Sequence, residues 1–122
     1  MIKKLDHLVL TTSDVKRCVE FYEALGFKPV EVLGRFELHA ENIKINVQTL
    51  GKELPPHALN IQPGSADFCF ELDCDIREFI KAARIAGVNP ERELVTRIGR
   101  FGSMTSVYYR DPAGNIIEFC QY

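Results

Sequence analysis

Apolar residues recur at spacings of three and four early in the chain, which predicts an amphipathic helix. The residues of this stripe are Val15, Cys18, Val19, Tyr22 and Leu25. Ser13 or Asp14 can cap the helix, because their side-chain oxygens can accept hydrogen bonds from the free amides of the first turn. Gly26 follows the last apolar position and suits the left-handed conformation in which many helices end.

The same pattern returns after an offset of 61 residues, the difference between Asp14 and Asp75. The two stretches match without a gap, from the capping aspartate to a proline beyond the helix. The matching pairs are Asp14/Asp75, Val15/Ile76, Lys16/Arg77, Val19/Ile80, Leu25/Ala86, Gly26/Gly87 and Pro29/Pro90. A repeat of this kind predicts that one structural module is present twice.

Short apolar or alternating segments flank both helices and predict strands. In the first copy, strands are expected at residues 5–11, 28–33, 35–40 and 43–48. In the second copy, they are expected at residues 66–72, 92–95, 104–110 and 116–120, with a turn at 111–115. The order βαβββ, linker, βαβββ predicts an α+β fold of two tandem modules, whose sheets can curl into an open mixed β-barrel around a pocket.

The length and composition of the chain are those of an ordinary globular protein. Its 122 residues predict one domain, with module one at 1–53, a proline-containing linker at 54–64 and module two at 65–122. Fifteen basic and seventeen acidic residues give a net charge of −2, which offers no footprint for nucleic acid or an anionic membrane.

The apolar segments and the cysteines both favour a cytoplasmic location. No apolar run reaches the roughly 18 residues of a membrane span, and the start of the chain does not read as a signal peptide. The four cysteines are scattered, with no C-x-x-C pair, which favours reduced structural thiols. We therefore expect a cytoplasmic protein.

His7 and Glu118 are the first candidates for chemistry. His7 shares one face of its expected strand with Val9 and Thr11. Glu118 lies within an apolar strand, where an unpaired inward carboxylate is unfavourable and a partner such as a metal ion is favoured. An imidazole and a carboxylate can together bind a divalent ion such as Zn, Mn, Ni, Co or Fe. Each residue has a structural alternative when taken alone. His7 could be a hydrogen-bonded structural histidine, and Glu118 could be a carboxylate that faces solvent.

Three segments carry a resemblance to a known family. They are Leu-Asp-His-Leu-Val-Leu at 5–10, Phe-Tyr-Glu-Ala-Leu-Gly-Phe at 21–27 and Tyr-Arg-Asp-Pro-Ala-Gly-Asn-Ile-Ile-Glu at 109–118. With them the whole chain resembles the vicinal oxygen chelate superfamily, which includes glyoxalases, fosfomycin-resistance proteins, bleomycin-resistance proteins and extradiol dioxygenases. The layout is most similar to small glyoxalase-domain proteins of the lactoylglutathione-lyase type.

The resemblance implies a metal site shared between the two modules. His7 and Glu118 would be ligands, and Glu118 would also be the catalytic carboxylate. In the last strand of module one, Gln48 is the first candidate for a further ligand and Asn46 the second, although many relatives carry His or Glu there. The counterpart of His7 in module two is Asp67 or Phe68, depending on the alignment, and family spacing favours Asp67.

A glycine-containing loop is expected at residues 96–104. Its Arg97 and Arg100 could bind a carboxylate or phosphonate through paired hydrogen bonds, with Tyr109 as a further substrate-binding residue. An ordinary solvated loop remains the alternative. The glycines at 99 and 102 do not connect a strand to a helix, so they form no dinucleotide-binding motif.

The leading functional hypothesis from the resemblance is a metal-dependent enzyme acting on a small oxygen-chelating substrate. The reaction would be a lactoylglutathione-lyase-like isomerisation or a fosfomycin-type epoxide opening, with glutathione as a candidate co-substrate. The alternative is a bleomycin-resistance-type protein that binds a small molecule without turnover. Extradiol ring cleavage is less favoured, because the sequence offers no convincing second histidine. A homodimer is also expected, since modules of different subunits often combine in this superfamily.

Overall fold

The computed structural model describes all of residues 1–122 and contains the repeated module twice. Module one consists of β1 (His7–Thr12), α1 (Val15–Ala24), β2 (Lys28–Val32), β3 (Arg35–His39) and β4 (Lys44–Thr49). Module two consists of β5 (Asp67–Glu71), α2 (Ile76–Ile85), β6 (Val95–Gly99), β7 (Gly102–Arg110) and β8 (Ile116–Gln121). Neither helix is long and apolar enough to cross a membrane.

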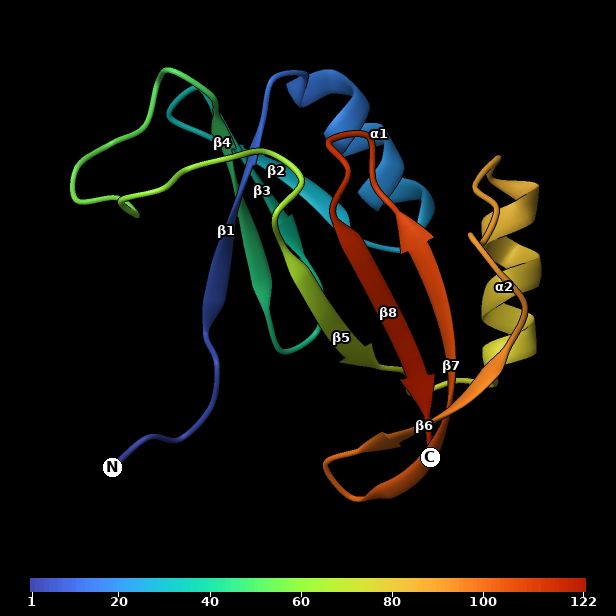
Figure 1. Cartoon of the computed structure of the whole chain (residues 1–122). Helices are drawn as coiled ribbons and strands as arrows, with labels where there is room; N and C mark the ends of the chain where they lie inside the picture. The colour runs from blue at the N-terminus through green and yellow to red at the C-terminus, as the bar shows by residue number, and fades with distance from the viewer.

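Each module forms its own four-stranded mixed sheet (Figure 1). Sheet A has the order β1-β4-β3-β2 and sheet B the order β5-β8-β7-β6. The first and last strands of each module run parallel, and the other pairs are antiparallel. The predicted α+β fold of two tandem modules is therefore confirmed. The expected barrel does not form within one chain, because β1 and β5 each pair with a single strand and keep one edge free.

Both helices begin and end where the sequence predicts. Asp14 accepts a hydrogen bond from the Arg17 amide at 3.1 Å, and Asp75 accepts one from the Arg77 amide at 2.8 Å. These carboxylates satisfy amides of the first turn that have no partner within the helix. After each helix, the chain reverses through a glycine with positive φ, +102° at Gly26 and +90° at Gly87.

One hydrophobic core joins the two modules. A cluster of 15 buried residues contains side chains from both helices and both sheets. The rings of Phe27 and Phe70, from different modules, lie 5.4 Å apart. The Tyr22 hydroxyl on α1 also donates a buried 2.7 Å hydrogen bond to Asp111, in the turn between β7 and β8 beside the helix (Figure 1). The helix-bearing faces of both sheets thus belong to one core, and we call the opposite face of each sheet its outward face.

Buried and exposed residues alternate along β1 and β5, and this alternation shows which side chains lie on the outward faces. On β1, Leu10 is buried, whereas Val9 is 49% exposed. On β5, Phe68 and Phe70 pack against the core, and the residues between and beside them are exposed. Polar side chains therefore occupy the outward faces of two separate sheets.

The expected loop at residues 96–104 is wrong, and so is the expected strand at residues 92–95. These residues form a β-hairpin in which β6 and β7 are joined by a turn at Arg100 and Phe101, with Gly99 paired to Gly102. The turn lacks the Asn-Gly or Asp-Gly sequence that is typical of a tight hairpin, so the sequence of this segment favoured a loop. Gly99 serves packing here, because a Cβ at this position would collide with Tyr122 and Met104.

Candidate functional site

Glu118 lies on the outward face of sheet B, on a strand with neighbours on both sides. Its register partners are Cys69 on β5 and Tyr108 on β7. One carboxylate oxygen of Glu118, Oε2, is buried and has no hydrogen-bond partner within the chain. An unpaired buried carboxylate oxygen is unfavourable, so this position is suited to a cation or a hydrogen-bond donor from outside the chain.

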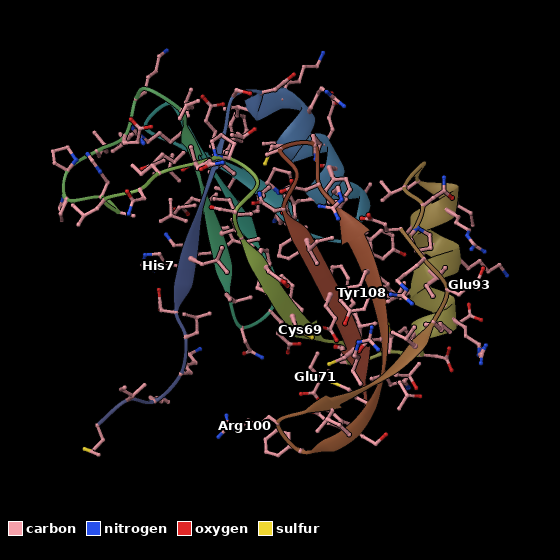
Figure 2. The ribbon with its side chains drawn as sticks, viewed as in Figure 1. His7, Cys69, Glu71, Glu93, Arg100 and Tyr108 are labelled. Carbon is pink, nitrogen blue, oxygen red and sulfur yellow. The ribbon has the colours of Figure 1, made fainter.

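Tyr108 and Arg97 form a pair of donors next to Glu118. The Arg97 Nε donates to the Tyr108 hydroxyl at 3.0 Å, and the guanidinium lies 5.6 Å from the centre of the same ring. The Tyr108 hydroxyl therefore accepts from Arg97 and keeps its own proton available for a ligand. Arg100 lies at the hairpin turn (Figure 2), and its guanidinium is 5.1 Å from the centre of the Phe101 ring instead.

The structure corrects the expectation for Tyr109. This residue is 0% exposed and packs between Phe79 and Phe119 on the core side of sheet B. It cannot reach a ligand on the outward face. Tyr108, its neighbour, lies on the outward face as the register partner of Glu118, which only the pairing of β7 with β8 shows.

Two thiols flank Glu118 on the same face. Cys69 is exposed, but the surrounding protein still withdraws part of its thiol from water, and this desolvation raises its pKa. The neighbouring Cys120 thiol and Glu118 carboxylate raise the pKa of Cys69 further. Burial is also the main cause that raises the pKa of Cys120. Both side chains therefore remain protonated near neutral pH, which makes them poor nucleophiles and poor metal ligands as they stand. All four cysteines of the chain are free.

The counterpart of His7 in sheet B is Asp67. Both residues begin the first strand of their module, and both lie opposite the first residue of the last strand, Lys44 or Ile116. The alternative, Phe68, packs against the core. Asp67 is exposed on the outward face, one row from Glu118.

His7 on sheet A is held in an orientation that suits a ligand. Its Nδ1 forms a 2.8 Å hydrogen bond with the carboxylate of Asp6. That hydrogen bond with His7 is the main cause that lowers the pKa of Asp6. Metal-binding histidines commonly donate one ring N–H to a carboxylate in this way and present the other nitrogen to the ion. The free Nε2 of His7 is therefore available.

Asn46 is better placed than Gln48 as the second donor of sheet A. Asn46 is the third residue of its strand, as Glu118 is in sheet B, and its Oδ1 is also buried without a partner. Gln48 donates a 3.0 Å hydrogen bond to Thr11 instead. It lines a cavity of about 450 Å³ between β1, β4 and the linker, where His57 is the only titratable residue. The two modules thus carry matching unpaired oxygens.

The predicted ligands do not come together within one chain. No group of three or more His, Cys, Asp or Glu side chains is arranged to hold a metal ion. Figure 2 shows His7 on β1 at one side of the molecule, with Cys69, Glu71 and Tyr108 on the other sheet. We call His7 and Asn46 on sheet A, and Asp67 and Glu118 on sheet B, the two candidate half-sites.

Comparison with known proteins identifies the family of the chain. Residues 4–119 match the family described as the Glyoxalase/Bleomycin resistance protein/Dioxygenase superfamily. The chain belongs to this superfamily. The resemblance to the vicinal oxygen chelate proteins is thereby confirmed.

Relatives within the superfamily match over the full chain. The glyoxalase domain-containing protein RDO1 of Mycosarcoma maydis is 38% identical over 99% of this chain and 69% of its own. The virulence protein STM3117 of Salmonella typhimurium is 40% identical over 100% of this chain and 86% of its own, and its crystal structure superposes with a TM-score of 0.93. A structure from the mobile metagenome of V. Pseudocholerae is 43% identical, with a TM-score of 0.93 over 100% of this chain and 96% of its own.

Proposed function

We propose that this superfamily member is a metal-dependent enzyme acting on a small oxygen-chelating substrate, with each active site built from two copies of the chain. One copy supplies His7 and Asn46 from sheet A, and the other supplies Asp67 and Glu118 from sheet B. The observation that carries the proposal is the pair of buried oxygens without partners, Asn46 Oδ1 and Glu118 Oε2, at equivalent places in the two modules.

The outward faces have the features of surfaces that pair with each other. Each has a free edge strand, β1 or β5, and each edge strand begins with an exposed candidate ligand, His7 or Asp67. Near these edges, sheet A carries His7 beside Lys44, which is paired with Glu37, and sheet B carries Asp67 and Glu71. A homodimer with exchanged faces would complete two sites.

The candidate side chains would have different roles in the reaction. A divalent ion held by the four donors would act as a Lewis acid toward the substrate oxygens. Glu118 would accept a proton from one substrate carbon and return it to the next in a lactoylglutathione-lyase-like isomerisation. Tyr108 would donate a hydrogen bond to a substrate oxygen, and Arg97 would bind an anionic group. In a fosfomycin-type reaction, the thiol of glutathione would open the epoxide.

Metal analysis of the purified protein tests the proposal. We expect a stoichiometric divalent ion, lost in His7→Ala and in Glu118→Ala and retained in the control Glu20→Ala, whose side chain is exposed on α1. Turnover of the methylglyoxal–glutathione hemithioacetal, or of fosfomycin with glutathione, would fall with the metal. A metal-free protein whose melting temperature does not change with added metal or chelator would contradict the proposal.

Binding without turnover is the second candidate function. The cavity between β1, β4 and the linker favours it, because Gln48, Asn60 and Gln62 offer amides to a ligand and no Asp, Glu, Lys or Arg lines the cavity. The amide of Asn46 is also a weaker metal ligand than the carboxylate or imidazole of many relatives. A protein that binds one of the test substrates tightly, carries no metal and gives no product would support this second function.

A further inference from the structure

A groove of about 850 Å³ lies between α2 and residues 89–94. It is lined by module two alone and includes none of the residues of the candidate metal site. Four basic side chains line it: Arg77, Lys81, Arg84 and Arg92. Ile80 and Leu94 contribute an apolar part to the lining. We propose that this groove binds an organic diphosphate.

The four basic side chains have no acidic partner within the chain. The ion pairs of the protein lie elsewhere and involve none of these four residues. Two carboxylates line the groove, those of Glu91 and Glu93. Glu91 is already bound to the guanidinium of Arg110, with contacts of 2.8 to 3.2 Å. Glu93, which Figure 2 shows beside α2, is therefore the one lining carboxylate outside an ion pair.

The first module shows that the fold does not require these charges. The same helix exists in both modules, and the offset of 61 residues relates their positions. The counterparts of Arg77, Lys81 and Arg84 on α1 are Lys16, Glu20 and Glu23. Two of the three positions thus carry the opposite charge on a helix that packs in the same way. The basic groove is a property of module two, which favours a role in binding over a role in folding.

The spacing and chemistry of the groove favour more than one phosphate. Arg77, Lys81 and Arg84 follow one another at spacings of four and three residues, which places them on one face of α2. Guanidinium groups bind phosphate oxygens through paired hydrogen bonds, and three cations on one face can together balance the charge of two linked phosphates. The apolar side chains of Ile80 and Leu94 offer a surface for the organic part of the same ligand.

NMR titration of the ¹⁵N-labelled full chain with pyrophosphate and with ADP tests the proposal. At about 0.15 M salt, where exposed charges are screened beyond about 8 Å, we expect saturable shifts confined to the amides of residues 76–94. ADP is expected to bind more tightly than pyrophosphate. Arg84→Gln is expected to weaken both by about tenfold, since a hydrogen bond to a charged group contributes at this level. The matched control Lys16→Gln on α1 is expected to leave the affinity unchanged.

Three outcomes would overturn the proposal. The first is the absence of saturable binding of either compound at this salt concentration. The second is binding whose shifts map to Arg97 and Arg100 on the β6–β7 hairpin. The third is an equal loss of affinity in Lys16→Gln and Arg84→Gln, because that result would mean a general attraction of anions to the surface. Loss of the metal site by Glu118→Ala is expected to leave ADP binding intact, so the two proposals can fail separately.

Discussion

Replacing Glu118 by methionine is expected to stabilise the metal-free protein. The substitution removes the buried oxygen without a partner between Cys69 and Tyr108. An unsatisfied buried polar group destabilises a folded protein by about 1–3 kcal/mol. Methionine has a similar length and adapts to irregular space, so little strain is expected in exchange. The free energy of unfolding should therefore rise by about 1–3 kcal/mol in the absence of metal.

Urea denaturation followed by circular dichroism can measure this difference at one fixed protein concentration. In the presence of chelator, Glu118→Met should be the more stable protein. With free zinc at about 1,000 times its dissociation constant, the wild type should gain about 4.1 kcal/mol and the variant nothing. The order of stability should therefore reverse when metal is added.

Tyr109→Phe provides the matched control. It also removes a buried oxygen without a partner, but on the core side of the same sheet. Its gain in stability should be the same with chelator and with zinc. If Glu118→Met were less stable than the wild type in chelator while Tyr109→Phe gained stability, the reasoning about Glu118 would be refuted, because the carboxylate would then have a stabilising partner within the chain.

Three further predictions concern other parts of the molecule. Tyr22→Phe should lower the free energy of unfolding by about 1.5–3 kcal/mol in urea denaturation, because it removes a buried donor from Asp111; an effect below half that range would contradict the role of this bond. Gly99→Ala should lower the melting temperature, since its Cβ would meet Tyr122 and Met104, whereas Gly34→Ala meets nothing and should act only through its positive φ. Alkylation of Cys69 by iodoacetamide should stay slower than that of free cysteine at pH 8.5, because a raised pKa keeps the thiol protonated to higher pH; equal rates would argue against desolvation as the cause.

The parts of the fold that depend on local sequence could be predicted well. The helices, their aspartate caps and their glycine ends follow from a few neighbouring residues, and the presence of two tandem modules follows from the repeat. The β6–β7 hairpin could not be predicted, because its Arg100-Phe101 turn has no tight-turn signature. Of its two glycines, Gly99 is required by packing and Gly102 by its positive φ of +117°.

The site was harder to predict, because it depends on contacts between distant segments. Both faces of β7 contain apolar or aromatic residues, so alternation alone did not decide between Tyr108 and Tyr109. That decision requires the register with β8. The choice between Gln48 and Asn46 likewise depends on the hydrogen bond to Thr11 and on burial, which the sequence does not show. The separation of the two half-sites follows from how the modules share their core.

The position of the half-sites on different sheets has a genetic consequence under the proposed dimer. A chain lacking His7 keeps an intact sheet B, and a chain lacking Glu118 keeps an intact sheet A. Neither variant alone can build a complete site, but a mixed dimer builds one good site from the two undamaged faces. After random reassociation of equal amounts, about a quarter of the wild-type sites should return. Two inactive alleles of this gene could then complement each other in one cell.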